Sequence, residues 1–282
     1  MRLQTIHTGN FKLDGGAMFG VVPKSIWQRL NPADEKNMCN WAMRCLLVED
    51  GDRLILIDNG LGDKQSEKFF GYYYLNGEDS LERSLQAAGV DFGDITDVVL
   101  THLHFDHCGG SVKWNTSHDK LELQFPNATY WSHKDHWKTA TEPNPREKAS
   151  FLQENILPIQ ESGQLKFIGD DLRISENITA FIANGHTEAM MVPLINYKGR
   201  TLVFAADLIP SAAHVPVNYV MAYDVQPLIS MSESQLFLEE CLAKDYTLFF
   251  EHDLLNECGT VKQTERGIKL DRTMSLDEFT HS

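Results

Sequence analysis

Apolar runs in the first hundred residues predict a hairpin, a helix and a buried strand. Residues 42–49 and 53–58 are apolar and are separated by an Asp-Gly-Asp turn, a pattern typical of a β-hairpin. Apolar residues at helical spacing, followed by a glycine C-cap, predict a helix over 80–89. Residues 96–101 predict a short buried strand that leads directly into a group of histidines.

The second half of the chain is predicted to contain further strands and one long helix. The strand-like runs cover 178–184, 190–196, 201–206 and 246–250. A helix is predicted over 232–244, with Ser232 as its N-cap. Its apolar face would consist of Leu236, Leu238, Cys241 and Leu242.

This order of elements bears on the fold class and on the number of domains. Hairpins followed by strands mixed with helices indicate an α+β or layered α/β body. No low-complexity linker divides the chain. We therefore predict a single domain over residues 1–282, in which residues 1–40 form an N-terminal lid or extension.

The chain is acidic, because 25 Lys+Arg against 40 Asp+Glu give a formal net charge of −15. Affinity for nucleic acids and for anionic membranes comes largely from Lys and Arg, so neither is expected as a partner. The chain has no run of about 18 apolar residues and no signal-peptide core, and its five cysteines are scattered without a CxxC pair. We therefore expect a cytoplasmic protein without a disulfide framework or a cysteine zinc site.

The strongest chemical signal is the sequence THLHFDH that begins at residue 101. His102 and His104 are two residues apart, so both imidazoles point the same way from an extended segment. Asp106 and His107 follow and must project elsewhere. Imidazole and carboxylate suit zinc, iron(II) and manganese, so four such side chains after a buried strand indicate half of a two-metal site.

Four further polar residues follow apolar runs. Asp207 comes after five apolar residues, where a carboxylate needs a cation or hydrogen-bond donors, although it could instead be a turn former or a helix N-cap. His186 and His252 could each be a ligand or an ordinary loop residue. Asp58 could support the histidine loop or simply form a turn.

Most of the other histidines are expected to have structural or surface roles. Surface positions are expected for His7, His118 and His281. His133 and His136 lie in a Trp-flanked helical segment and are expected to be structural. His214 lies in the loop after Asp207 and could line a pocket.

The THLHFDH sequence, a downstream Gly-His, a strand-terminal Asp and a late His resemble the metallo-β-lactamase-fold metallohydrolases. The resemblance spans nearly the whole chain. It implies an α+β fold, a four-layer αββα sandwich of two mixed β-sheets with helices on the outer faces. It also implies a binuclear centre at one edge of the sheets, with two divalent metal ions for which zinc is favoured over iron or manganese.

Carried over to this sequence, the resemblance assigns a complete ligand set. The first metal would be held by His102, His104 and His186. The second would be held by Asp106, His107 and His252. Asp207 would bridge both metals, and Asp58 would support the histidine loop from outside the ligand shell.

The resemblance also implies a mechanism, in which a hydroxide shared by two metals attacks a carbonyl carbon and Asp106 gives a proton to the leaving group. Asp207 and Asp106 are thus the expected catalytic residues. β-Lactamases of the main group have a cysteine where Asp207 stands, which makes lactamase activity an unlikely match. Related lactonases often have a tyrosine where this chain has Pro210, so the role of polarising the carbonyl is either empty here or filled by the second metal, His214, Tyr219 or Tyr223.

Residues 13–23 resemble the N-terminal segment of the branch that contains N-acyl homoserine lactone lactonases and methyl parathion hydrolase. Four residues could form an apolar pocket wall or ordinary core packing: Met18, Phe19, Phe105 and Tyr223. An apolar wall favours a neutral or apolar small-molecule lactone or ester.

We therefore expect a binuclear metal-dependent hydrolase of a lactone or a carboxylic ester, within a possible homodimer. The alternatives are a phosphotriesterase or phosphodiesterase, a glyoxalase II-like thioesterase and, less favoured, a non-catalytic metal sensor. The C-terminal region 253–282 has no tyrosine, unlike the glutathione-binding region of glyoxalase II-like enzymes.

Overall fold

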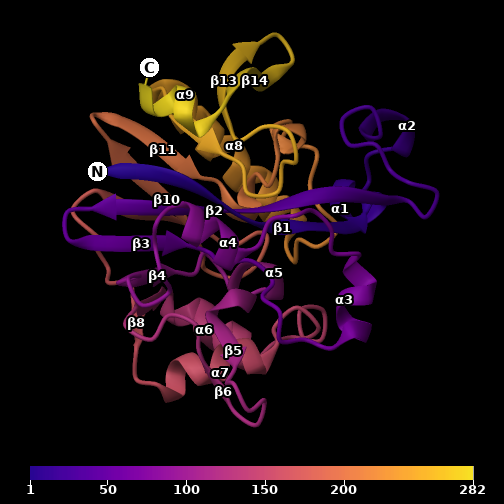
Figure 1. The fold of residues 1–282 in the computed structure, drawn as a ribbon. Helices are drawn as coiled ribbons and strands as arrows, with labels where there is room; N and C mark the ends of the chain where they lie inside the picture. Colours follow the sequence, from indigo (N-terminus) through magenta and orange to yellow (C-terminus); the bar gives the residue numbers. More distant parts are fainter. Residues whose placement is uncertain (282) are drawn as a thin grey trace.

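Two six-stranded β-sheets stack face to face in the computed structural model, which describes residues 1–281 (Figure 1). The first sheet has the order β1 (Arg2–Asp14), β2 (Met38–Asp50), β3 (Arg53–Ile57), β4 (Asp97–Val99), β7 (Thr129–Ser132), β8 (Leu165–Phe167). The second has the order β14 (Gly267–Met274), β13 (Cys258–Thr264), β12 (Thr247–Phe249), β11 (Arg200–Phe204), β10 (Met190–Tyr197), β9 (Ile178–Ala183). A separate ribbon pairs β5 (Val112–Trp114) with β6 (Leu121–Leu123). Both large sheets mix parallel and antiparallel neighbours.

Helices cover the outer faces of the two sheets (Figure 1). The first sheet is covered by α4 (Leu81–Ala87), α6 (Lys134–Thr141) and α7 (Gln153–Glu161). The second is covered by α8 (Pro227–Lys244), and α9 (Leu276–His281) ends the described chain. The short helices are α1 (Gly15–Phe19), α2 (Lys24–Trp27), α3 (Glu67–Tyr73) and α5 (Phe105–Cys108).

Strand β2 shows why the chain forms this layered structure. Leu46 and Val48 belong to the core between the sheets, whereas Cys45 and Leu47 belong to the core under α4, α6 and α7. Successive side chains of a strand point to opposite faces, so a strand that is apolar throughout must be covered on both faces. The αββα sandwich that results confirms the predicted fold class.

The predicted hairpins are confirmed, but the late helix differs from its prediction. Strand β2 turns into β3 with Asp50 opposite Arg53. Helix α8 begins at Pro227, so Ser232 lies inside it and is not its N-cap. Leu236 and Leu242 are exposed, because the buried face follows the spacing of Ser230, Ser234, Phe237, Leu238 and Cys241.

The N-terminal segment is partly built into the first sheet. Strand β1 pairs with β2 along most of its length and β2 begins at Met38, so of residues 1–40 the part between these strands, 15–37, lies outside the sheet. Within residues 1–281, no helix combines the length and the apolar character that crossing a bilayer requires. All five cysteines are buried and free, as expected.

Asp97→Asn is expected to destabilise the fold by about 3 kcal/mol at neutral pH, because it breaks a largely buried ion pair. Asp97 accepts two hydrogen bonds from Arg53 and one from Trp131 Nε1. Burial raises the pKa of Asp97, but hydrogen bonds from Arg53, Thr96 and Trp131 outweigh it and hold the pKa below its ordinary value. The contribution of the Asp97 carboxylate to the free energy of unfolding is therefore complete above its unfolded pKa of about 4. It is lost as the pH falls through the lower folded pKa. Urea unfolding of the unsubstituted protein and of Asp97→Asn from pH 7 to pH 3 tests this. A difference in the free energy of unfolding that stays constant across this range would contradict it.

Candidate metal centre

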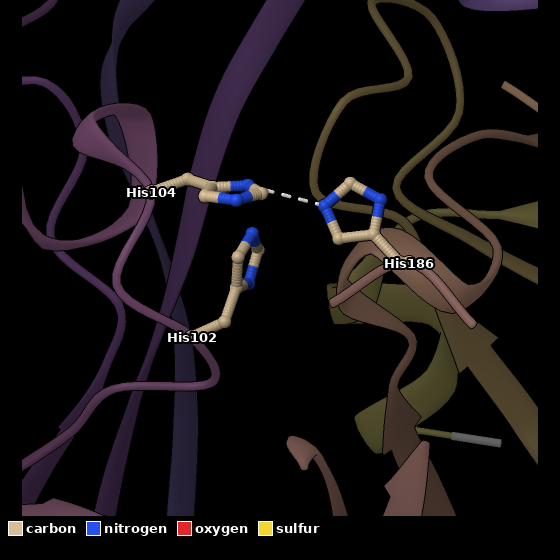
Figure 2. A group of neighbouring side chains, drawn as sticks. All are labelled: His102, His104 and His186. Atoms are coloured by element: carbon tan, nitrogen blue, oxygen red, sulfur yellow. Dashed lines mark hydrogen bonds between the residues drawn. The ribbon is translucent and has the colours of Figure 1, made fainter. Parts of the chain in front are cut away.

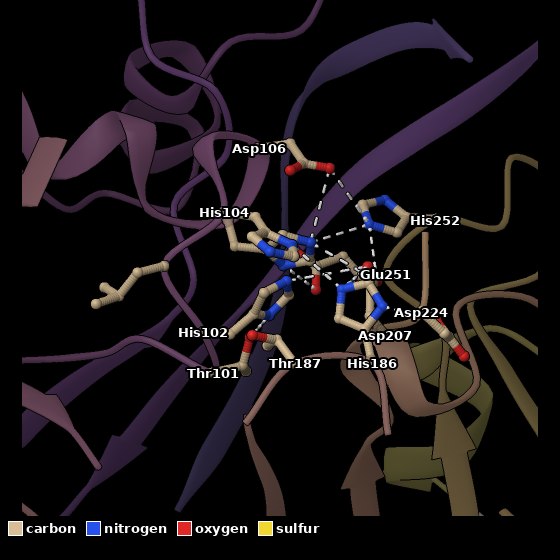
Figure 3. A network of polar contacts seen from close by, with 12 residues as sticks. Thr101, His102, His104, Asp106, His186, Thr187, Asp207, Asp224, Glu251 and His252 are labelled. Carbon is tan, nitrogen blue, oxygen red and sulfur yellow. Dashed lines mark hydrogen bonds and ion pairs between the residues drawn. The ribbon is translucent and has the colours of Figure 1, made fainter. Parts of the chain in front are cut away.

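The loops that follow β3, β4, β9, β11 and β12 meet at one edge of the sandwich. Figure 3 shows the network that their polar side chains form there. The parallel pairs β3–β4 and β11–β12 end at the same edge, which brings distant segments together. The predicted site residues on these loops are Asp58, His102, His104, Asp106, His107, His186, Asp207 and His252. All eight are buried and lie in one cluster.

Three histidines form the first group (Figure 2). His104 Nδ1 lies 3.2 Å from His186 Nε2, and the ring of His102 packs edge-on against both. The three rings come from both sides of the sandwich, since His102 and His104 follow β4 and His186 follows β9. Their ring nitrogens lie close enough together to share one cation.

The second group contains His107, His252 and Asp106. His107 Nε2 and His252 Nε2 are 3.2 Å apart. Asp106 Oδ2 lies 3.7 Å from the first of these nitrogens and 3.8 Å from the second. This is a second place where three potential ligand atoms converge.

Asp207 lies between the two groups and turns one oxygen toward each (Figure 3). Its Oδ2 is 3.1 Å from His186 Nε2 and 3.9 Å from His102 Nε2. Its Oδ1 is 3.2 Å from His252 Nε2 and 3.7 Å from His107 Nε2. A carboxylate in this position can serve both groups at once.

Hydrogen bonds outside the cluster fix the orientation of the rings. His186 Nδ1 lies 2.9 Å from Asp224 Oδ1, and His252 Nδ1 lies 2.8 Å from the carbonyl oxygen of Ala42. Because these oxygens only accept, the ring proton belongs on Nδ1 in both histidines. In the neutral form of each ring, Nε2 therefore presents a lone pair to the centre of the cluster.

Two carboxylates face the outer nitrogen of His107. Asp58 Oδ2 and Glu251 Oε2 each lie 3.1 Å from His107 Nδ1. Asp58 also accepts hydrogen bonds from the backbone N–H and the hydroxyl of Thr101. Asp58 thus ties the start of the histidine loop to its end, in the supporting position that the sequence analysis expected.

The donor atoms of the cluster fit divalent cations. Ring nitrogens of two histidines lie only 3.2 Å apart in each group, which is unfavourable unless a proton or a metal ion lies between them. Buried His102 Nε2 and Asp207 Oδ1 also make no hydrogen bond. Imidazole and carboxylate are ligands for zinc, iron and manganese.

The electrostatics of the cluster also favour positive charge. Burial raises the pKa of Asp207, but His186, His107 and His252 outweigh it and hold the pKa well below its ordinary range. Burial lowers the pKa of His252, yet Asp207 raises it to about 9. Burial lowers the pKa of His102 well below its ordinary value, so this ring stays neutral. The centre therefore attracts a cation, either protons or metal ions.

Close packing holds the histidine loop in place. A Cβ atom on Gly109 would lie 2.1 Å from the carbonyl oxygen of Leu61, so the two backbones touch. On the other side, the Leu103 N–H donates to His136 Nε2, while His136 Nδ1 contacts the carbonyl oxygen of Glu188. Burial lowers the pKa of His136 to about 3, which agrees with its expected structural role as a neutral ring.

A cavity of about 300 Å³ opens over the cluster. Of the four candidates for an apolar wall, Met18, Phe105 and Tyr223 line it. Phe19 does not, because it stacks between Trp27 and His214 in the core. His214 does not line this cavity either, since its ring nitrogens contact Met18 O and Ser211 Oγ.

Several residues at the site were not identified from the sequence. Asp224 and Glu251 contact ligand-type histidines, and Glu147, Arg146 and Tyr73 line the cavity. All five lie outside the THLHFDH sequence, and no short-range spacing links them to it. Only Glu251 could have been identified from the sequence as a site residue, because it directly precedes His252.

Comparison with known proteins supports this description. The family model described as the metallo-beta-lactamase superfamily matches residues 44–252. An N-acyl homoserine lactonase from Bacillus cereus is 23% identical over 251 residues, which cover 83% of this chain and 89% of the lactonase.

Solved structures share the fold over almost the whole chain. A probable metal-dependent hydrolase from Staphylococcus aureus matches with a TM-score of 0.85 and 28% identity, covering 97% of this chain and 98% of that chain. A dizinc quorum-quenching lactonase, in complex with the product N-hexanoyl-L-homoserine, matches with a TM-score of 0.78 and 23% identity, covering 97% of this chain and 95% of that chain. The second likeness shows the fold alone. The chain belongs to the metallo-beta-lactamase superfamily and, like its relatives, is a metal-dependent hydrolase.

Proposed function

We propose that the protein hydrolyses a lactone or a carboxylic ester at a centre of two divalent metal ions, with zinc as the first choice. The position of Asp207 carries this proposal, because its two oxygens face two separate groups of ligand atoms. The proposed ligands of the first ion are His102, His104 and His186. Those of the second are Asp106, His107 and His252, with Asp207 shared.

The chemistry follows from the donor set and the cavity. Two divalent ions held there would lower the pKa of a water molecule and polarise a carbonyl oxygen. Asp106 lies both in the second ligand group and on the cavity wall, where it can carry a proton to the leaving alkoxide. Tyr223 lines the cavity, whereas Tyr219 and His214 line a separate small recess. Tyr223 is therefore the side chain best placed to hydrogen-bond the substrate carbonyl in place of a tyrosine at Pro210.

The cavity wall supports an acyl or aryl substrate. Leu13, Met18, Phe105 and Met221 contribute apolar surface around the metal cluster. Phe105 packs against Tyr73 with ring centroids 4.7 Å apart, which gives one side an aromatic surface. Apolar walls with few polar groups are typical of sites for small organic ligands.

A substrate panel tests the proposal. Protein with measured metal content is assayed on an acyl homoserine lactone, an aryl ester, a thioester and an aryl phosphotriester. We expect kcat/KM for the lactone or the ester to exceed that for the other classes at least tenfold, a difference of about 1.4 kcal/mol in transition-state binding. Metal-free protein is the control.

Other outcomes would assign other functions. Turnover of the phosphotriester without turnover of lactone or ester would replace the proposal with phosphotriester hydrolysis. Thioester preference would favour the glyoxalase II-like alternative. Full metal occupancy without turnover of any class would favour a metal-binding sensor.

A further inference from the structure

Arg146 lies on a well-defined turn in the cavity wall. The side-chain oxygen of Asn144 accepts hydrogen bonds from the backbone N–H groups of Arg146 and Glu147, which fixes the start of the turn. Further along, the carbonyl oxygen of Ser150 accepts from the N–H of Phe105, at the start of α5. The turn is therefore attached to the loop that carries the predicted ligands.

Hydrogen bonds from one nitrogen orient the guanidinium group of Arg146, and its other two nitrogens are left without a partner among the described residues. Its Nη2 donates to the carbonyl oxygens of Ala222 and Asp224. Within residues 1–281, its Nη1 and Nε make no hydrogen bond, and no carboxylate lies within 4 Å of the group. Arg53 shows the contrast, since its guanidinium makes a bidentate pair with Asp97.

The carboxylates near Arg146 are committed to other partners. Glu147 accepts from Thr187 Oγ1 at 2.5 Å and lies 3.7 Å from His104 Nε2. Asp224 pairs with His186 Nδ1 at 2.9 Å. Arg146 is exposed, and its positive charge has no carboxylate partner on the wall of the cavity that opens over the cluster.

We infer that the substrate carries a carboxylate that pairs with Arg146. This inference rests on the proposed function, which places the scissile carbonyl at the metal cluster. A guanidinium attracts a carboxylate by its charge, and Nη1 or Nε can each donate one charge-assisted hydrogen bond, whereas both bidentate edges of the group include Nη2, which is already engaged. Asp224 contacts Arg146 through its carbonyl oxygen and His186 through its side chain, so the guanidinium lies one residue away from the cluster. One small molecule can therefore reach both the guanidinium of Arg146 and the cluster. The expected substrate is thus no longer wholly neutral: it is an ester or lactone with an apolar body and one carboxylate.

Binding of two matched amides tests the inference without any turnover. The probes are the monoamide of adipic acid, which has a carboxylate, and hexanamide, which has the same chain length without it. Calorimetry on zinc-loaded protein should show that Arg146→Gln weakens binding of the adipic monoamide at least tenfold and changes hexanamide less than twofold. Arg146→Lys should lie between, because lysine keeps the charge but loses the two backbone contacts that orient the guanidinium. Lys148→Gln, which removes an exposed cation two residues away that does not line the cavity, is the matched control and should change neither. Equal weakening of both amides, or no binding of the adipic monoamide to the unsubstituted protein, would overturn the inference.

Kinetics separate this inference from the proposed function. The substrates are 4-nitrophenyl hexanoate and the mono-4-nitrophenyl ester of adipic acid. The unsubstituted protein should prefer the carboxylated ester, and Arg146→Gln should remove that preference through KM with little change in kcat. Turnover of both esters with no preference overturns the inference and leaves the proposed function standing. Absence of turnover of these esters and of the lactone in the substrate panel, with the difference in amide binding intact, overturns the proposed function and leaves the carboxylate site standing.

Discussion

Asp207→Ala is expected to lose metal and activity together. One oxygen of Asp207 faces His186 and the other faces His252, so its removal withdraws a negative ligand from both groups at once. Loss of residues that merely orient metal ligands already costs about 10–100-fold in affinity or activity. We therefore expect activity to fall more than about 100-fold. Metal content after dialysis, measured beside kcat/KM, is the test.

Two variants control this prediction. Asp207→Asn keeps the shape of the side chain but removes its charge, and should also lose metal. Asp97→Asn neutralises another buried carboxylate, at the start of β4, and should keep its metal although it lowers stability. Retention of two metal ions per chain by Asp207→Ala would refute the bridging position of this residue.

Gly109→Ala is expected to destabilise the protein by about 3 kcal/mol or more, because an added methyl group has nowhere to go. It would lie 2.1 Å from a backbone oxygen, so the chain itself must move. For a chain of this length, about 3 kcal/mol corresponds to a fall in Tm of roughly 6–12 °C. The affinity for metal should fall as well, since Gly109 directly follows the loop with His107. Thermal unfolding and metal titration measure the two effects.

The matched control is Gly71→Ala in helix α3. No atom lies within 4 Å of a Cβ added at Gly71, and its φ is negative. Alanine is better than glycine within a helix by about 1 kcal/mol, so this variant should be slightly more stable and bind metal normally. A Gly109→Ala protein as stable as Gly71→Ala would show that the two loops can separate without cost.

The layers of the fold and the centre of the site could be predicted because both depend on local patterns. Strands such as β2 and β3 are recognisable from apolar runs and an Asp-Gly turn. His102 and His104 share a direction because they are two residues apart in an extended segment. Asp207 stood out because a carboxylate at the end of an apolar strand needs a partner. In each case the physical reason lies within a few residues of sequence.

The rest depends on contacts between segments that are distant in sequence. Asp224 acts on His186 from 38 residues away, and Glu147 contacts Thr187 from 40 residues away. For Phe19 the pattern left the pocket wall and the core open, and stacking against Trp27 and His214 places it in the core. The start of α8 was misplaced because Ser232 resembles a cap, whereas a proline in the first turn begins the helix earlier. Such outcomes are decided by packing, which a pattern along one segment does not contain.

The meeting of loops from both sheets links metal loading to the assembly of the fold. Strand β4 of the first sheet leads to His102, His104 and His107, whereas strands of the second sheet lead to His186, Asp207 and His252. Neither half holds all of the proposed ligands, so a cation bound by both would act as a cross-link between two halves that are far apart in the chain. A ligand that binds only the folded state stabilises it by about 4 kcal/mol when the free ligand concentration is a thousand times its Kd. Metal supply in the cell would then govern how much of the chain survives proteolysis, as well as how much of it is active.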